Sequence, residues 1–212
     1  MFANPTLPIE NNLSRVATPA RHGREPFQGE HRTYLLMNTS WLSIQIDIPE
    51  SELQLLGQKL ALARLPPQQN PKWAEQNGVT PSFIRDTIKF WREDYDWRAE
   101  EARLNKLPHF ITSIESPGFG TIDVHFGNSK ATSSDAIPLL FLHGWPGSFM
   151  EVMKALPALN EAGFNVVAPS LPGYGFSTYP DEAGFNHRKH AEVLNALMLR
   201  LGYDEYVVQG GD

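Results

Sequence analysis

Three short apolar segments separated by helix-like segments constrain the fold of the second half of the chain. Ile137–Leu142 and Asn165–Ala168 are rich in apolar residues, as is typical of strands buried on both faces of a parallel sheet. The segments at about 149–161 and 186–202 carry apolar residues at helical spacing, and Tyr206–Gln209 follows as a third strand. This strand, helix, strand, helix, strand order predicts an α/β fold with right-handed crossovers and a parallel sheet.

The preceding part of the chain has a different pattern. Residues 1–32 are rich in Pro, Asn and Arg without periodicity and predict a disordered leader. Local patterns then predict four elements: a strand at 44–49, a helix at 51–63, a helix that begins at Thr80-Pro81, and a hairpin of 110–115 with 121–126. In the second of these helices, Phe83, Ile84, Ile88 and Trp91 share one face.

Composition excludes several classes of function. The 212 residues include no cysteine, which excludes disulfides, thiolate metal sites and a cysteine nucleophile. Residues 107–212 carry 5 Lys/Arg against 11 Asp/Glu, so we expect no nucleic-acid partner. We also expect no transmembrane span and no secretory signal, because no apolar run is long enough. The predicted location is the cytoplasm, as a soluble protein or peripheral to a membrane.

Three clusters follow the predicted parallel strands, where open α/β sheets bind ligands. They are His143-Gly144-Trp145-Pro146-Gly147, the segment 170–177, and Gly210-Gly211-Asp212. Small residues before Asp212 suit a tight turn between a strand and a helix, which is where many hydrolases carry their nucleophile. The sequence therefore predicts a site at this edge of the sheet.

The residues around these clusters resemble one family. Leu139–Phe149, Val167–Ser177 and Gln209–Asp212 look like the corresponding segments of microsomal-type epoxide hydrolases, which belong to the α/β-hydrolase superfamily. Trp91–Asn105 resembles the N-terminal domain of that family. The resemblance implies a mostly helical epoxide hydrolase N-terminal domain at 33–113, followed at 114–212 by the first half of an α/β-hydrolase core.

The resemblance also implies a chemistry for named residues. Asp212 is the expected nucleophile, which opens an epoxide to form an alkyl-enzyme ester, and the backbone N–H of Trp145 is one donor of the oxyanion hole. Trp145 and Pro146 are expected to line the substrate pocket. The expected substrate is a small-molecule epoxide, either foreign or an endogenous lipid epoxide, and no cofactor or metal is expected.

The other groups that this family chemistry needs are expected outside these 212 residues. They are the second oxyanion donor, the general-base histidine, its acidic partner and two cap tyrosines, and Tyr174 and Tyr179 match no cap position. The chain therefore resembles a family member truncated at its nucleophile, and we expect it to be inactive alone. Two alternatives stay open: a non-catalytic fragment that binds a partner, and a hydrolase that resembles haloalkane dehalogenases.

Several other polar residues have structural interpretations. His143 is expected to order its loop, with no direct role in proton transfer. His187 and His190 have a spacing that could ligate a metal, but a solvated helix start is favoured. Asp96-Trp97-Arg98 and Glu101 are expected to form a structural cluster.

Overall fold

The computed structural model describes residues 14–16, 41–65, 78–180 and 182–211. The predicted leader at 1–32, apart from Ser14–Val16, and the predicted nucleophile Asp212 lie outside the described residues. Of the described residues, those of Asp47–Leu104 form one compact unit, and those of Met1–Ile46 and Asn105–Asp212 form a second. The domain boundaries expected at residues 32 and 113 stay predictions.

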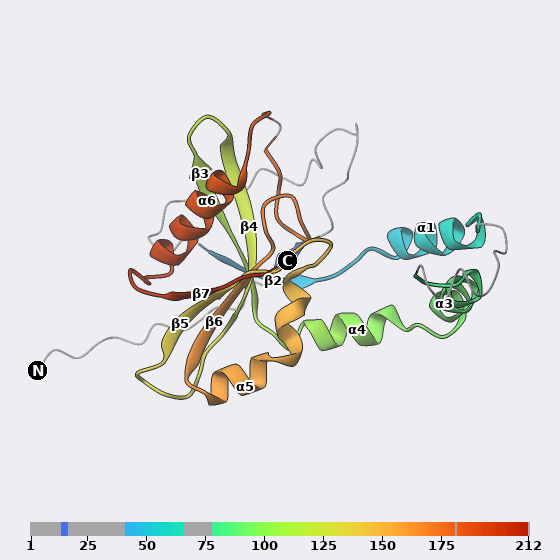
Figure 1. The fold of residues 1–212 in the computed structure, drawn as a ribbon, viewed down its shortest axis with the longest axis horizontal. Helices are drawn as coiled ribbons and strands as arrows, with labels where there is room; N and C mark the ends of the chain where they lie inside the picture. The colour runs from blue at the N-terminus through green and yellow to red at the C-terminus, as the bar shows by residue number, and fades with distance from the viewer. Residues whose placement is uncertain (1–13, 17–40, 66–77, 181, 212) are drawn as a thin grey trace, which may run out of the picture. The chain divides into compact units, whose positions relative to one another are not determined.

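A twisted seven-stranded sheet forms the second unit (Figure 1). Its strands, in the spatial order β1-β2-β3-β4-β6-β5-β7, are β1 (Ser14–Val16), β2 (Leu42–Ile46), β3 (His109–Ser116), β4 (Gly120–Ser129), β6 (Phe164–Pro169), β5 (Ile137–Phe141) and β7 (Val207–Gln209). β5 pairs in parallel with both β6 and β7, as the sequence predicts. β5 thus lies between its two later neighbours, so the chain crosses over twice.

β3 and β4 form the predicted antiparallel hairpin, with Ser116 opposite Gly120. Gly118 has φ +85° in the connecting turn, a backbone conformation that residues other than glycine rarely adopt. Ser113 and Glu115 of β3 are exposed, whereas Val124–Gly127 of β4 is buried. The difference arises because β6 pairs with the far edge of β4 and brings this hairpin into the main sheet.

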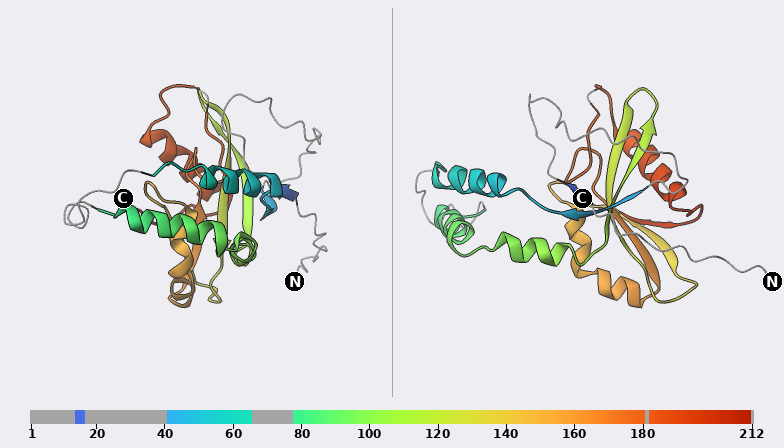
Figure 2. Two further views of the ribbon diagram at one scale, coloured as in Figure 1. Left: turned by 90° about the vertical axis from the view of Figure 1, so that its right-hand side faces the viewer. Right: turned by 180° about the vertical axis from the view of Figure 1, so that it is seen from behind.

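The two faces of the sheet bury alternate residues, because successive side chains of a strand point to opposite sides. Leu140 and Val167 pack in one core cluster, which includes residues of α6 (His187–Arg200). Leu139 and Val166 pack in another, with Val152. The segments 149–161 and 187–200 therefore cover opposite faces of the sheet (Figures 1 and 2).

The single helix predicted at 149–161 is wrong in one respect. The structure has a 3-10 helix, η1 (Phe149–Lys154), followed by a short α-helix, α5 (Leu156–Glu161). Pro157 lies in the first turn of α5, and because proline has no backbone N–H, an α-helical bond to the turn before it cannot form. The helix is therefore interrupted between Lys154 and Leu156, where Pro157 prevents a continuous series of α-helical hydrogen bonds.

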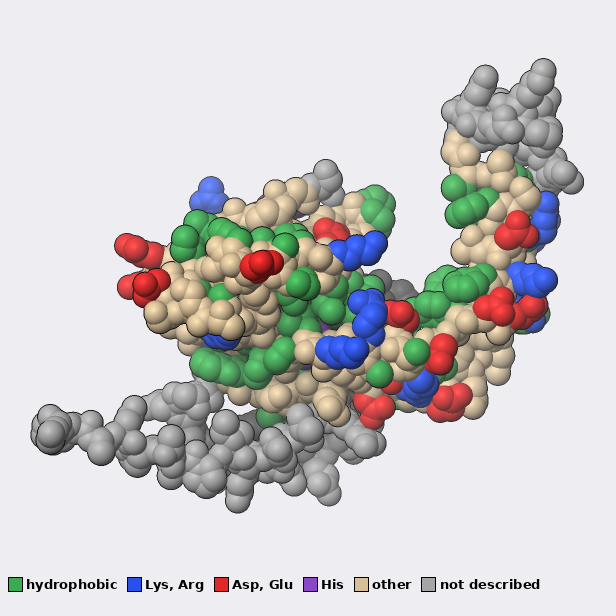
Figure 3. All heavy atoms as spheres, turned by 90° about the horizontal axis from the view of Figure 1, so that it is seen from below, with side chains coloured by type: hydrophobic (Ala, Val, Ile, Leu, Met, Phe, Trp, Pro, Cys, Tyr) green, Lys and Arg blue, Asp and Glu red, His purple; other side chains and the backbone are tan. Residues whose placement is uncertain are grey.

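The other unit contains three described helices, α1 (Glu50–Ala61), α3 (Pro81–Glu93) and α4 (Trp97–Leu104). The Thr80 side chain caps α3 by accepting a hydrogen bond from the Phe83 N–H at 3.2 Å, which confirms the predicted start. α3 is amphipathic, yet Pro81 is its single buried residue among those described. Hydrophobic side chains such as Phe83 and Trp91 are exposed. Figure 3 shows hydrophobic and charged side chains interspersed on the face of the molecule that it presents.

The polar cluster predicted near residue 100 is present, and Trp97, Arg98 and Glu101 of this cluster belong to α4, a helix that was not predicted from the sequence. The buried Glu101 carboxylate accepts hydrogen bonds from Ile48 N–H at 2.7 Å, Arg98 at 2.7 Å and Trp97 Nε1 at 3.0 Å. Asp96 instead accepts from the Ala99 N–H at the start of the helix. Burial would raise the pKa of the Glu101 carboxyl, but these hydrogen bonds hold it below its usual value.

Across the described ranges, no helix combines the length and the apolar character that a membrane crossing requires.

Candidate functional site

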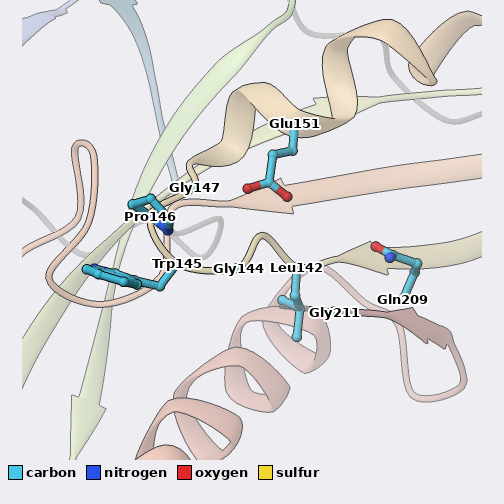
Figure 4. Close-up of a pocket in the computed structure, with 8 residues that line it drawn as sticks. All are labelled: Leu142, Gly144, Trp145, Pro146, Gly147, Glu151, Gln209 and Gly211. Atoms are coloured by element: carbon cyan, nitrogen blue, oxygen red, sulfur yellow. The ribbon is translucent and has the colours of Figure 1, made fainter. Parts of the chain in front are cut away.

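A pocket of about 330 Å³ lies where β5 and β7 end (Figure 4). It is lined by the turn after β5, by one residue of η1 and by the end of β7: Leu142, Gly144, Trp145, Pro146, Gly147, Glu151, Gln209 and Gly211. Its volume is at the lower end of the range of small-molecule sites. The pocket is therefore at the edge of the sheet where the sequence predicts a site.

The turn after β5 is closed by its own backbone. The Gly147 N–H donates to the Gly144 carbonyl at 2.9 Å, and the Trp145–Pro146 peptide bond is cis. Ser148 then caps η1 by accepting from the Met150 N–H at 3.3 Å. The turn thus presents backbone groups to the pocket at fixed positions.

Gly147 lies directly beneath the Glu151 carboxylate. A Cβ at position 147 would come 1.6 Å from Glu151 Oε1 and 2.8 Å from the Gly144 carbonyl oxygen. Both are closer than atoms approach in folded proteins, so a glycine is required here for close packing. Figure 4 shows the Glu151 and Gln209 side chains extending into the space above the turn, while the Trp145 ring extends away from them.

His143 joins this turn to the loop that follows β6. Its ring is buried, with Nδ1 at 2.9 Å from the Gly144 carbonyl oxygen and Nε2 accepting a hydrogen bond from the Leu171 N–H at 3.1 Å. The Tyr174 ring packs edge-on against it, with ring centroids 5.2 Å apart. His143 therefore orders its loop, as predicted.

A second buried histidine anchors the same loop to β4. His125 Nδ1 lies 2.9 Å from Ser170 Oγ, and the Ser170 N–H donates to the His125 carbonyl at 2.9 Å. Ser177 Oγ accepts from the His125 N–H at 3.0 Å and donates to the Ser170 carbonyl at 2.7 Å. Both ends of the loop are thus fixed to one residue of the sheet.

Burial keeps the His125 ring neutral. Its Nε2 lies 3.1 Å from His109 Nδ1, and the two rings stack with centroids 5.2 Å apart. Loss of hydration, followed by the charge of His109, lowers the pKa of His125 from 6.5 to about 3. This pair was not predicted from the sequence, because alternation in β3 and β4 indicates only that both residues are on one face.

The structure brings together some of the predicted site residues. Trp145 and Pro146 both line the pocket, and residue Trp145 is 72% exposed. Gly211 lines it too, whereas Asp212 lies outside the described residues. The roles predicted for Asp212, Trp145 and Pro146 stay predictions.

Other lining residues were not predicted. Glu151 comes four residues after Gly147, one turn into the next helix, and Gln209 is the last residue of β7. Such positions at the ends of strands and the starts of helices are the signal by which Glu151 and Gln209 could have been found.

His187 and His190 lie in the first turn of α6, and His190 makes contacts with backbone carbonyls of Asn186 and Pro172. Within the described ranges, no group of three His, Asp or Glu side chains could hold a metal ion.

The order and pairing of β3 to β7, with helices on both faces, define the class of protein as an α/β hydrolase. The model of the protein family described as "alpha/beta hydrolase fold" matches residues 137–212. The model of the family described as "Epoxide hydrolase N terminus" matches residues 42–152, about half of the chain. The chain therefore belongs to the epoxide hydrolase family that this N-terminal segment defines.

Curated relatives agree with this assignment. A putative epoxide hydrolase of Stigmatella aurantiaca is 36% identical over 178 residues, which cover 79% of this chain and 39% of that protein. Epoxide hydrolase 1 of Sus scrofa is 37% identical over 182 residues, which cover 79% of this chain and 38% of that protein. The chain thus spans about two fifths of the length of these relatives.

Solved structures show the same fold. The epoxide hydrolase of Aspergillus niger aligns with a TM-score of 0.73 at 33% identity, over 82% of this chain and 47% of that one. The juvenile hormone epoxide hydrolase of the silkworm Bombyx mori aligns with a TM-score of 0.73 at 32% identity, over the same shares. The predicted fold class and family are confirmed.

Proposed function

We propose that the protein hydrolyses small-molecule epoxides to vicinal diols through an ester on Asp212. The observation that carries this proposal is the pocket at the ends of β5 and β7, which Trp145 and Gly211 line in a chain of the epoxide hydrolase family. Gly211 directly precedes Asp212 in the sequence. A substrate in this pocket is thus bounded by the turn that carries the proposed oxyanion donor.

The reaction has two steps. An aspartate, whose ordinary pKa is about 3.9, is ionised at neutral pH and attacks a ring carbon without a base. The carbon–oxygen bond of the ring breaks, and the released alkoxide takes a proton from an acid that we expect outside these 212 residues. Water, activated by a histidine also expected there, then adds to the ester carbonyl. The Trp145 N–H stabilises the resulting oxyanion, and collapse releases the diol and the carboxylate.

Intact mass spectrometry tests the proposal. The protein expressed from its complete reading frame is mixed with styrene oxide under single-turnover conditions and quenched. We expect a transient mass increase equal to one epoxide, which peptide mapping assigns to Asp212. Asp212→Ala is the control and acquires no adduct. A wild-type protein that forms no adduct with styrene oxide or with a long-chain epoxide contradicts the proposal.

The alternatives predict other outcomes. A dehalogenase releases halide from a chloroalkane, and Trp145 is the residue that favours this second candidate, since an indole can bind a halide. A non-catalytic fragment shows no turnover and elutes as an aggregate or a complex. We expect the 212-residue chain on its own to show no turnover and to elute as an aggregate or a complex.

A further inference from the structure

We propose that His143 is a positioning residue that holds the Gly144–Trp145 peptide plane and so aims the Trp145 N–H. This inference rests on the proposed function, in which that N–H is an oxyanion donor. The Gly144 carbonyl and the Trp145 N–H belong to the same peptide unit, so any group that fixes the carbonyl also fixes the N–H.

The protonation state of the His143 ring follows from its partners. The Leu171 N–H is a donor, so Nε2 at 3.1 Å from that nitrogen must be an acceptor and carries no proton. The neutral ring therefore carries its proton on Nδ1, which donates to the Gly144 carbonyl at 2.9 Å. A backbone donor on the loop after β6 and a backbone acceptor on the turn after β5 thus select one tautomer.

The Gly144 carbonyl has two donors and no remaining capacity. It accepts from His143 Nδ1 and from the Gly147 N–H, each at 2.9 Å. In a trans peptide the N–H points opposite to the carbonyl, so the Trp145 N–H is directed away from both donors. Two hydrogen bonds to the carbonyl also polarise the peptide and strengthen its N–H as a donor.

The other end of this chain of contacts is equally fixed. Ser170, which precedes Leu171, is fully buried and bonded to His125 through both its N–H and its hydroxyl. The contacts therefore run from β4, through Ser170 and Leu171, to His143 and the Gly144–Trp145 peptide. Because each of these groups is a buried side chain or part of the backbone, this series of contacts connects the turn after β5 to the sheet and fixes its position.

Two substitutions separate the two bonds of His143. Asn places an N–H donor near the position of Nδ1, so His143→Asn keeps the bond to the Gly144 carbonyl. Gln places a carbonyl oxygen near the position of Nε2, so His143→Gln keeps the bond from Leu171 and loses the other. His190→Gln is the matched control, since His190 contacts the same loop at Pro172 and not the turn.

The first readout does not need activity. Gly144–Trp145 is the single Gly-Trp pair of these 212 residues. In the complete protein, labelling glycine carbonyls with ¹³C and tryptophan with ¹⁵N gives an HNCO cross-peak for this peptide, which its loss in Trp145→Phe identifies. We expect the peak to stay in place in His143→Asn and His190→Gln and to shift in His143→Gln. An unchanged peak in His143→Gln overturns the proposal.

The second readout is the rate of each chemical step in the complete protein. Removal of an oxyanion donor lowers rates by about 10²–10³-fold, so a misdirected donor should lower the rate of ester hydrolysis at least tenfold in His143→Gln. His143→Asn should restore most of that rate, with KM unchanged. Equal rates in all variants of an active enzyme overturn the inference alone, whereas an inactive wild type overturns the proposed function alone.

Discussion

Single residues decide how the loops at the sheet edge are held. His125 and His143 are both buried, and each makes two hydrogen bonds through its ring nitrogens. His125 anchors the loop after β6, and His143 connects that loop to the turn after β5. Their effects can therefore be measured one residue at a time.

The depressed pKa of His125 predicts an acid-dependent loss of stability. Burial and the charge of His109 lower this pKa to about 3 in the folded protein, against 6.5 in the unfolded chain. Between these values the unfolded chain binds a proton that the folded chain does not. The free energy of unfolding should therefore be unaffected above pH 6.5 and fall by about 1.4 kcal/mol per pH unit below it.

Urea unfolding between pH 7.5 and 5 measures this slope. His125→Gln should lower stability at pH 7.5 but reduce the slope by the contribution of one histidine. The exposed His187 provides the control, because His187→Gln should keep the wild-type slope. Parallel curves for His125→Gln and wild type would refute the assignment. The Glu101 carboxyl, whose pKa is also lowered, contributes at lower pH, below about 4.5.

Crowding and backbone strain can be separated at two glycines. Gly175 has φ +51°, and a Cβ there would come 2.5 Å from Ser170 Oγ; Gly163 has φ +88° and nothing within 4 Å of that position. Gly163→Ala should cost about 1 kcal/mol from strain alone. Gly175→Ala should cost about 1–2 kcal/mol more, because Ser170 must leave its partners. Thermal unfolding checks this, and equal losses would contradict it.

At the scale of helices and strands, the residues that begin or interrupt a helix act on their near neighbours in the sequence. Thr80 and Asn186 each accept hydrogen bonds from the first turn of the helix that follows, at α3 and α6. The interrupted helix at η1 and α5 is likewise explained by one proline. Such features act over only a few residues, so the sequence carries their signal, although the break before α5 was not predicted from it.

The cap of α3 can be tested by its hydroxyl. Thr80→Ala should destabilise the start of α3 by about 1 kcal/mol, because the Phe83 N–H loses its acceptor. Thr87→Ala is the control in the same helix, where the hydroxyl donates to the Phe83 carbonyl without capping it. Amide hydrogen exchange at Phe83 should rise about fivefold in the first variant and stay constant in the second. A similar rise in both would contradict the cap.

At the scale of the whole molecule, the outer edge of the sheet matters most. β7 pairs with β5 and is the outermost described strand on that side. Val207 and Val208 are 45% and 56% exposed there. An exposed apolar edge strand is a template for pairing with another chain.

We therefore predict self-association of the 212-residue chain through β7. Light scattering after size exclusion should give a mass above that of a monomer. Val208→Lys should shift the chain toward the monomer, because a charged edge resists pairing. Leu199→Lys replaces an equally exposed apolar residue on α6, away from the sheet edge, and should leave the mass unchanged. Equal effects of the two substitutions would argue against edge pairing.

The sequence predicted more of the fold than of the site. The parallel strands, the hairpin and the helix starts followed from apolar patterns and caps, and the resemblance supplied the family. Helix α4, which is short and half charged, and the break before α5 were not predicted. The sequence placed Trp145 and Pro146 near a site, but not Glu151 or Gln209, because their place in the pocket depends on where separate strands end.

The sequence by itself determined the local elements, since capping, alternation and the missing N–H of proline act between near neighbours. The tertiary structure alone decided which distant groups meet. Leu171 donates to His143 across 28 positions, and Ser170 bonds His125 across 45. These pairs are fixed by the order of β4, β6 and β5 in the sheet. The Gly144–Trp145 peptide is therefore oriented by packing, which no local pattern specifies.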